Sequence, residues 1–372
     1  MKTIYFDYAA TTPIDPAVFK SMLPYLKNEF GNASSIHSLG QKAQIAIDKA
    51  RKQTADFLHC NPEQIIFCGS ATEANNIAIL GLTKDKPNYH VITSKIEHPS
   101  VLNTVKQLNA EVTYLSPASD GVIRVDDVKN AIKENTILIS IMYANNEIGT
   151  IQPIKEIKEL IAKANHKIYF HVDAVQAANY LDCNVKNIDL LTLSGHKIYG
   201  PKGIGILYAR DIKSLKPIIY GGGQESGLRP GTENVANIVG FGTAISLIKR
   251  QKDIKKLRDK IIKEILKIPG AKLNGSLQNR LPNNINVSFK GIEGESLLML
   301  LDQKGIATST GSACSSKELK PSNVLLALGL EPKETHGSLR ITLGRFTTQK
   351  EVDYLLKILP LAVKQLRSLS PY

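Results

Sequence analysis

The chain has 372 residues, of which 42% are apolar and 22% charged, a composition typical of a globular protein with one large domain or two unequal ones. No apolar run approaches the roughly 18 residues of a membrane span, and the opening residues lack the regions of a signal peptide. The net charge is +13, but the lysines are scattered through amphipathic stretches such as Lys249 to Lys267. We therefore expect a generally basic surface, with no direct binding of nucleic acid and no membrane contact.

Residues 1–60 predict a strand at Thr3–Phe6, a turn at Ala9–Pro13 and two helical stretches. From about residue 64, strand-like and helix-like segments alternate. The expected segments are the strand Gln64–Cys68 and helix Ala71–Leu82, Tyr89–Thr93 and Pro99–Leu108, Glu111–Leu115 and Val125–Ile132, Thr136–Tyr143 and Ile154–Ala164, and the strand Lys167–Val172. This alternation predicts an α/β fold with a mainly parallel sheet that is covered by helices on both faces. Ligands of such sheets bind beyond the carboxyl ends of the strands.

Polar residues follow four of these strands at that edge. Ala71 and Thr72 open a helix, where free N–H groups can hold a phosphate, and His98, Asn146 and Asp173 each follow a later strand. Each position has a structural alternative, because hydroxyl and carboxylate side chains at strand ends often only cap the next helix. Their convergence on one edge favours a shared binding site.

The run Ser194-Gly195-His196-Lys197 lies between two apolar segments, Ile188–Leu193 and Ile204–Tyr208. This pattern predicts a strand, a turn and a returning strand, with Lys197 held at a strand end. A lysine in a partly desolvated pocket becomes a nucleophile toward carbonyl groups, and pyridoxal phosphate is the common cofactor that uses one as a Schiff base. The alternative is an ordinary solvated charge, since Lys197 is one of 47 lysines and arginines.

The polar residues at the same edge suit this cofactor. Asp173 would keep the pyridine nitrogen protonated, and His98 would stack on the ring and exchange protons. Asn146 and Gln176 would hydrogen-bond the ring oxygen.

Glu233 to Ile268 predicts a long basic helical stretch that leads to a second domain. Shorter units follow it, namely the strand Asn284–Phe289, helix Gly294–Gln303, strand Ile306–Ser309, helix Asn323–Leu328, strand Leu339–Leu343 and a last helix with the capping-box pattern Thr348-Gln349-Lys350-Glu351. We expect a large cofactor-binding domain at residues 13–255 and a small domain made of residues 1–12 and 256–372.

The four cysteines, Cys60, Cys68, Cys183 and Cys314, show neither a C-x-x-C pair nor zinc spacing, so we expect a reducing cytoplasm and no metal site. Small residues surround Cys314 in the segment Ser309–Ser316, which predicts an accessible loop with a reactive thiol. Cys60 and Cys183 are interpreted as small buried hydrophobes.

Five motifs, SGHKIYGPKGIG, HVDAVQ, ANNEIGTIQP, ATEANN and YFDYAATTP, together resemble the cysteine desulfurases of the NifS/IscS type, which are fold-type I pyridoxal-phosphate enzymes. The resemblance extends over nearly the whole chain and implies a seven-stranded-type sheet plus a smaller α/β domain. It makes Lys197 the Schiff-base lysine, Asp173 the pyridine partner and His98 the stacking residue. The phosphate ligands that it implies are Ala71, Thr72, Ser194 and His196. One departure is FCGSATE, where many relatives have Thr-Ser-Gly before ATE, so that Cys68 lies near the cofactor.

The resemblance also implies assembly and chemistry. Thr232 would reach the phosphate of a neighbouring subunit, which implies a homodimer, and Arg340 with Asn146 would bind the substrate. Cys314 would receive sulfur as L-cysteine becomes L-alanine, and the persulfide would pass to an iron–sulfur scaffold or a tRNA-thiolation carrier. The long segment from Cys314 to Thr335 matches the longer-loop group, which hands sulfur directly to such proteins. The alternatives are a selenocysteine lyase or an aminotransferase on the same fold, or a basic RNA-binding or scaffolding protein with a relic cofactor pocket.

Overall fold

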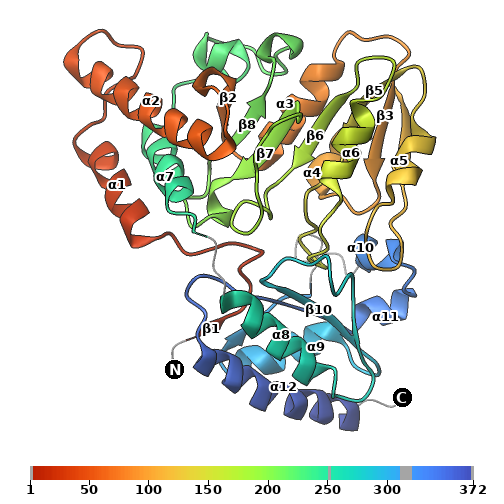
Figure 1. Cartoon of the computed structure of the whole chain (residues 1–372). Coiled ribbons are helices and arrows are strands. Elements are labelled where there is room, and N and C mark those ends of the chain that lie inside the picture. Colours follow the sequence, from red (N-terminus) through yellow and green to blue (C-terminus); the bar gives the residue numbers. More distant parts are fainter. Residues whose placement is uncertain (1–2, 250–252, 311–320, 370–372) are drawn as a thin grey trace.

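The structure is a computed structural model that describes residues 3–249, 253–310 and 321–369 (Figure 1). Its larger part is built on a seven-stranded sheet with the strand order β2-β8-β7-β6-β5-β3-β4. The strands are β2 (Ile65–Cys68), β3 (His90–Ser94), β4 (Glu111–Leu115), β5 (Thr136–Ser140), β6 (Tyr169–Asp173), β7 (Leu190–Ser194) and β8 (Gly205–Ala209). Only β8 runs antiparallel to its neighbours, which confirms the predicted mainly parallel sheet and the returning strand after Lys197.

Helices cover both faces of this sheet, as the alternation of segments predicts. One face packs against α1 (Pro16–Lys27), α2 (Ser38–Leu58), α5 (Val125–Ala131), α6 (Ile154–Ile161) and α7 (Val235–Ser246). The other packs against α3 (Ala71–Thr83) and α4 (Pro99–Val105). Neighbouring residues of β2 show the division, since Phe67 joins the first core and Ile66 the second. Strands buried on both faces explain the continuous apolar runs of the sequence.

A second core surrounds a three-stranded antiparallel sheet with the order β12-β10-β9. Its strands are β9 (Ala271–Leu273), β10 (Asn284–Phe289) and β12 (Ser338–Thr342), and its helices are α8 (Asp253–Ile265), α9 (Gly294–Gln303) and α12 (Gln349–Leu369). The predicted capping box at the start of α12 is confirmed, because the Thr348 N–H donates to the Glu351 carboxylate at 2.8 Å and the Glu351 N–H donates back to the Thr348 hydroxyl at 3.3 Å.

The N-terminal segment belongs to this second core. Strand β1 (Ile4–Tyr5) pairs in parallel with β11 (Ile306–Ala307), and Phe6 is fully buried among the small-sheet residues. From there the chain passes to the larger sheet, so residues 6–12 lie between the two parts (Figure 1).

The predicted single helical stretch from Glu233 to Ile268 is wrong. Helix α7 ends at Ser246 and packs with α1 and α2, whereas α8 begins at Asp253 and packs on the second core. The apolar faces of the two helices serve different cores, which one straight helix cannot do. The predicted domain bounds, 13–255 and 1–12 with 256–372, stay a prediction.

The remaining short elements lie at the ends of the strands or between the two parts. They are the short helices α10 (Asn323–Ala327) and α11 (Pro332–His336) and the 3₁₀ turns η1 (Pro62–Gln64), η2 (Gly195–Lys197), η3 (Ile212–Ser214) and η4 (Gln224–Gly227). Helix α10 packs through Val324 and Leu325 against Ile96 and Ile148 of the larger part.

Candidate active site

Lys197 lies at the end of β7, as predicted, in the turn η2. Its side chain is half-buried, and Nζ donates to the carbonyl oxygens of Ala9 at 2.5 Å and Ala10 at 2.6 Å. The Asn179 amide holds the Lys197 backbone carbonyl at 2.7 Å. The ammonium group is therefore oriented by two backbone carbonyls from the N-terminal segment.

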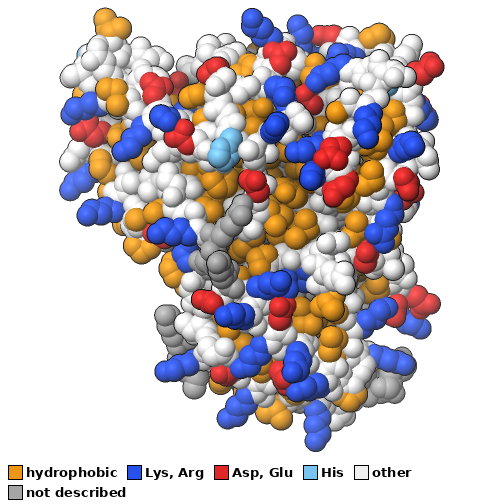
Figure 2. Space-filling model, in the orientation of Figure 1, with side chains coloured by type: hydrophobic (Ala, Val, Ile, Leu, Met, Phe, Trp, Pro, Cys, Tyr) orange, Lys and Arg blue, Asp and Glu red, His pale blue; other side chains and the backbone are white. Residues whose placement is uncertain are grey.

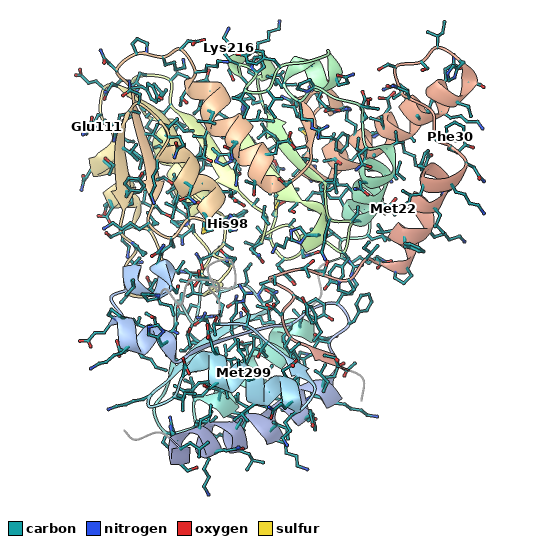
Figure 3. The ribbon with its side chains drawn as sticks, turned by 180° about the vertical axis from the view of Figure 1, so that it is seen from behind. Met22, Phe30, His98, Glu111, Lys216 and Met299 are labelled. Atoms are coloured by element: carbon teal, nitrogen blue, oxygen red, sulfur yellow. The ribbon has the colours of Figure 1, made fainter. Side chains whose placement is uncertain are left out.

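Asp173 ends β6 and His98 follows β3, and β5 lies between these two strands in the sheet. Asp173 is 6% exposed, and one carboxylate oxygen accepts the Val175 N–H at 3.1 Å within a turn. Among the described residues no helix lies between β6 and β7, so the alternative of a helix cap does not apply at Asp173. His98 caps α4 and lies at the edge of the larger part that faces the second sheet (Figure 3). Burial lowers the pKa of His98, the Asp173 carboxylate opposes this shift, and the Lys197 ammonium adds to it. These three side chains thus lie close enough for their charges to act on one another.

Gln176 and His196 complete this edge. The Gln176 amide donates to the Ala9 carbonyl at 3.0 Å, so Gln176 and Lys197 share one acceptor. His196 Nδ1 lies 3.2 Å from the Thr11 hydroxyl. Burial lowers the pKa of His196 to about 4, and the positive charges of Lys197 and Lys202 add to the shift, so its ring is neutral at pH 7.

The helix α3 begins directly after β2, as predicted for a phosphate site. Ser70 caps this helix by accepting the Glu73 N–H at 3.1 Å, which is the structural alternative for this position. Thr72, in the first turn, is exposed, and Ala71 is half-buried. A Cβ atom at Gly205 would lie 2.7 Å from the Ala71 nitrogen, so only glycine on β8 lets the start of α3 lie this close to the sheet. Ser194, at the end of β7, is 3% exposed and pairs with Gly205.

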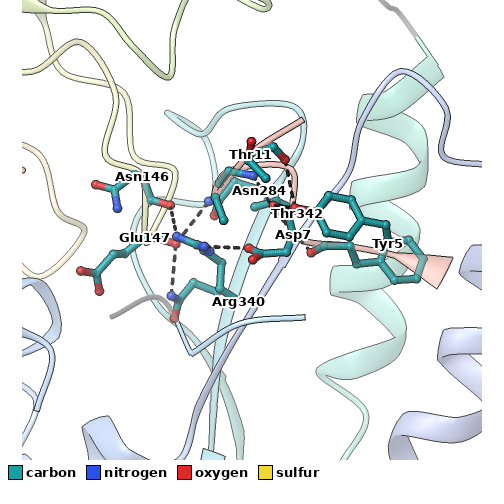
Figure 4. A network of polar contacts seen from close by, with 12 residues as sticks. Tyr5, Asp7, Thr11, Asn146, Glu147, Asn284, Arg340 and Thr342 are labelled. Carbon is teal, nitrogen blue, oxygen red and sulfur yellow. Dashed lines mark hydrogen bonds and ion pairs between the residues drawn. The ribbon is translucent and has the colours of Figure 1, made fainter. Parts of the chain in front are cut away.

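Arg340 lies in β12 of the small sheet and reaches the site from the other side (Figure 4). Nη2 forms an ion pair with Asp7 at 2.7 Å, and Nη1 donates to the Asn146 carbonyl at 3.1 Å. The Arg340 side chain is 3% exposed, and its Nε is buried without a hydrogen-bond partner. A buried unpaired N–H next to a guanidinium charge is a donor for a carboxylate ligand.

The structure does not bring Thr232 to this cluster within the one chain. Thr232 is exposed in the loop between η4 and α7, and its hydroxyl makes no hydrogen bond within the described parts of the chain. Cys314 lies outside the described residues. Cys68 is 1% exposed, and burial raises the pKa of its thiol well above the usual value, with the Glu73 and Glu225 carboxylates adding to the shift. Cys183 is buried in the core and Cys60 packs against it half-buried, close to the interpretation from sequence.

The sequence interpretation missed four groups at this site. The Ala9 and Ala10 carbonyls bind Lys197, although the segment was read only as a turn, and Asp7 pairs with Arg340. Asn75, buried in α3, donates to Asp173 at 2.9 Å. The available signal was that these residues fall inside the motifs YFDYAATTP and ATEANN.

Other kinds of site were also sought in the residues that the structure describes. They contain no group of three or more His, Cys, Asp or Glu side chains placed to hold a metal ion. Across the same residues, no helix is long and apolar enough to cross a membrane. Figure 2 shows lysine and arginine side chains interspersed with acidic ones on this face, in agreement with a generally basic surface.

Comparison with known proteins identifies the family of this chain. The family model described as Aminotransferase class-V matches residues 4–355. The chain is 50% identical to "Cysteine desulfurase IscS" of Methanosarcina thermophila, covering 100% of this chain and 94% of the relative, and 48% identical to the protein of that name from Clostridium botulinum (strain Hall), covering 100% and 96%. A solved structure described as "NIFS-LIKE PROTEIN" superposes with a TM-score of 0.92 at 36% identity, covering 98% of this chain and 100% of that one. Another, "SspA in complex with cysteine", gives 0.84 at 41% identity, covering 93% and 100%. This chain therefore belongs to the class-V aminotransferase family.

Proposed function

We propose that this protein is a pyridoxal-phosphate-dependent cysteine desulfurase that converts L-cysteine to L-alanine and leaves the sulfur as a persulfide on Cys314. The observation that carries the proposal is the convergence of Lys197, His98 and Asp173 at three strand ends of one sheet. Relatives named as cysteine desulfurases match over the whole chain, which favours this reaction over those of a selenocysteine lyase or an aminotransferase. An iron–sulfur scaffold or a tRNA-thiolation carrier then accepts the sulfur.

The donors and acceptors at this edge fit pyridoxal phosphate. The N-terminus of α3 offers N–H groups to a phosphate at Ala71 and Thr72, and Ser194 and His196 lie at the end of β7. Asp173 presents a buried carboxylate to a protonated ring nitrogen. Gln176 and Asn146 carry amides for the ring oxygen. The set contains one anion site, one carboxylate and one lysine, which are the partners that this cofactor requires.

When bound, the cofactor supplies an electron-withdrawing ring that stabilises negative charge on the substrate Cα. Arg340 holds the substrate carboxylate, with its Nε free of other acceptors in the described structure. Lys197 Nζ takes the proton from Cα, from a position that the Ala9 and Ala10 carbonyls define. His98, neutral because its pKa is lowered, exchanges a proton near the ring.

The sulfur step belongs to Cys314. Its thiolate attacks the substrate sulfur, the new S–S bond forms, and the C–S electron pair remains on the substrate Cβ, where a proton completes alanine. An unperturbed cysteine has a pKa near 8.5, so about a few per cent is thiolate at pH 7, and a base must take its proton. Cys68 is unsuited to this role, because burial raises its pKa.

A homodimer is part of the proposal, in which Thr232 completes the phosphate site of a second copy. Large apolar side chains are exposed on the arm formed by α1, α2 and their link, and Phe30 marks its tip (Figure 3). They are Phe19, Leu23, Leu26, Phe30, Ile36 and Ile45, with Ile36 92% exposed. A patch of this kind on a folded protein marks an interface, and a second copy of the chain would cover it.

A cytoplasmic location is proposed on the absence of a disulfide among the described cysteines. The two apolar cores support a division into two domains close to the proposed bounds, residues 13–255 and 1–12 with 256–372, although Ile254 at the start of α8 already belongs to the second core.

The decisive experiment measures alanine released from cysteine in the presence of a reductant. Cys314→Ser should keep its cofactor and change its absorbance when cysteine is added, yet release almost no alanine. Cys60→Ser is the matched control and should turn over normally. Turnover that requires an added 2-oxo acid would instead establish an aminotransferase, and normal turnover by Cys314→Ser would refute the proposed sulfur acceptor.

The dimer has its own test. Thr232→Ala should weaken retention of the cofactor without changing the thermal stability of the cofactor-free protein, since the Thr232 side chain is exposed. Light scattering that shows a monomer with full cofactor content would refute the shared site.

A further inference from the structure

A continuous chain of hydrogen bonds joins Asp173 to His98 through two buried side chains that the proposed mechanism does not use. Asn75 of α3 is 0% exposed, and its Nδ2 lies 2.9 Å from Asp173 Oδ2 and 2.9 Å from the Ser100 hydroxyl. The Ser100 hydroxyl lies 2.8 Å from His98 Nδ1. The Ser100 N–H also donates to His98 Nδ1 at 3.1 Å.

The direction of each bond follows from its donors. The Asn75 amide nitrogen has two hydrogens and no lone pair to accept with, so it donates to both Asp173 and Ser100. The reverse orientation of the amide would set the Asn75 oxygen against the Asp173 carboxylate, and two acceptors at 2.9 Å repel. The Ser100 oxygen therefore accepts from Asn75. Because the Ser100 backbone N–H donates to His98 Nδ1, this ring nitrogen is an acceptor, and the Ser100 hydroxyl hydrogen points at it.

His98 Nδ1 then receives two donors, the hydroxyl and the backbone N–H of Ser100. A ring nitrogen that accepts a hydrogen bond carries no proton. The neutral imidazole must therefore hold its proton on Nε2, the nitrogen on the other side of the ring. The hydrogen-bonded series Asp173–Asn75–Ser100–His98, called the relay below, thus sets the tautomer of His98. It starts from a carboxylate to which His98 makes no direct hydrogen bond in the described structure.

We propose that Asn75 and Ser100 are positioning residues, which hold His98 in the Nε2–H tautomer and tie its orientation to that of the Asp173 carboxylate. This inference rests on the proposed function, because only there does His98 exchange protons. In the proposed reaction His98 offers a proton from Nε2 alone, and Nδ1 is closed to protonation while the relay is intact. A change in the charge on Asp173 is passed to His98 through the two side chains as well as through space.

The charged groups around His98 agree with a neutral ring. The Asp173 carboxylate comes from β6 and the Lys197 ammonium from η2, and they act on His98 in opposite senses. Glu97, the preceding residue, accepts from the Ser94 hydroxyl at 2.6 Å and from the Met142 N–H at 3.0 Å, both at Oε1. Burial raises the pKa of the Glu97 carboxyl to about 8, which favours its neutral form at pH 7.

The test reads the tautomer directly. Holoenzyme with ¹⁵N-labelled histidine is examined by long-range proton–nitrogen correlation at pH 7 to 8, with the His98 signals assigned by His98→Gln. The wild type should show a protonated Nε2 and an unprotonated Nδ1. Ser100→Ala and Asn75→Ala should each shift both nitrogen signals toward a mixture of tautomers. Their kcat should fall by about tenfold, a part of the roughly 10²–10⁴ that a positioned proton-transfer group contributes, with KM nearly unchanged.

Two variants test whether the loss of any side-chain hydrogen bond in α3 or α4 disturbs His98. The Thr104 hydroxyl donates to the Ser100 carbonyl at 2.7 Å rather than joining the relay, and the Asn76 amide donates to the Thr72 carbonyl at 2.8 Å. Thr104→Val and Asn76→Ala should leave the His98 signals in place. A wild-type proton on Nδ1, or equal shifts in Thr104→Val and Ser100→Ala, would overturn the relay. Failure of the wild type to release alanine would refute the proposed function instead, since the tautomer is read without turnover.

Discussion

The two sides of the site are built in different ways. On the rim of the seven-stranded sheet, Asp173 ends a strand, and Lys197 and His98 lie within four residues of a strand end, so the parallel register brings them together. On the opposite side, Arg340 lies within β12, and its partner Asp7 is 333 residues away in the sequence. Backbone hydrogen bonds hold both sides, and the Arg340 side depends in addition on an ion pair between two largely buried side chains. Replacement of a rim side chain should remove chemistry, and replacement of Arg340 or Asp7 should also remove stability.

The largest effect is expected for Lys197→Ala on the rim. Loss of the general base should lower kcat by roughly 10²–10⁴ or more, while the thermal midpoint stays close to that of the wild type, because strand β7 and not the side chain fixes the turn. Alanine release and thermal unfolding measure the two quantities. Borohydride treatment of the wild type should fix the cofactor on the peptide that contains Lys197. A label on another lysine would contradict the assignment.

On the opposite side, Arg340→Gln should affect both activity and stability. KM for cysteine should rise about 10- to 100-fold, since a carboxylate loses a charged donor. Unfolding should become easier by roughly 3 kcal/mol, because Asp7 keeps its charge without a partner. The double variant Asp7→Asn with Arg340→Gln should recover most of the stability but not the KM. Equal stability of single and double variants in urea would show that the pair does not hold this side.

Glu97 gives a pH-dependent way to sharpen the comparison, because its carboxyl is a buried rim group that forms no ion pair with the described residues. Burial raises the pKa of Glu97 to about 8, from an ordinary value of 4.5. The folded protein then binds a proton that the unfolded chain has released, so the contribution of Glu97 to stability is complete below pH 4.5 and is lost as the pH rises toward 8. The free energy of unfolding of Glu97→Gln should therefore rise relative to that of the wild type, by at most about 1.4 kcal/mol per pH unit in this window. Urea midpoints at pH 5, 6, 7 and 8 measure the gain, and parallel curves would contradict it.

The smallest effect on activity is expected for Cys68→Ser. The Cys68 thiol lies at the end of β2 beside the phosphate side of the rim, but it is buried and donates only to the Ile66 carbonyl, at a distance of 3.7 Å. A serine hydroxyl is too short to make this contact, so the substitution buries an unpaired hydroxyl and should lower the free energy of unfolding by about 1–3 kcal/mol. Alanine release should nevertheless stay within about twofold of the wild type, because the proposed reaction gives Cys68 no role. A dead Cys68→Ser together with an active Cys314→Ser would reverse the roles of the two cysteines.

The rim could be read from the sequence because its logic is local. Each of Asp173, Asn146 and Lys197 lies in a short polar segment at the end of an apolar run, and the rule for parallel sheets converts that order into proximity. The Asp7–Arg340 pair could not be read in this way, since no periodicity links residue 7 to residue 340. Asn75 was also hidden, because a buried asparagine inside a helix shows its partners only when a second helix and a strand end have been placed.

The break between α7 and α8 was missed for a related reason. Amphipathic periodicity is present both before and after Lys249. The sequence does not reveal that the apolar faces of these two segments belong to separate cores. Secondary structure inside each core followed from composition, but the assignment of a helix to one core or the other is a long-range property.

The position of the N-terminal segment has a consequence for synthesis of the protein on the ribosome. Ile4 pairs with Ile306, which is made about 300 residues later, or roughly 15 to 60 s at the usual rate of translation. Until Ile306 has been made, strand β1 has no partner strand, so the position of Ala9 and Ala10 is not fixed. Their carbonyls then cannot orient Lys197, even if the seven-stranded sheet has already formed. A chain that terminates before β11 would therefore form the seven-stranded sheet, but the Lys197 side chain would not be oriented. Cofactor capture can thus serve as a reporter of full-length translation, and a bulky fusion placed directly before Ile4 would disturb the active site before it disturbs the fold.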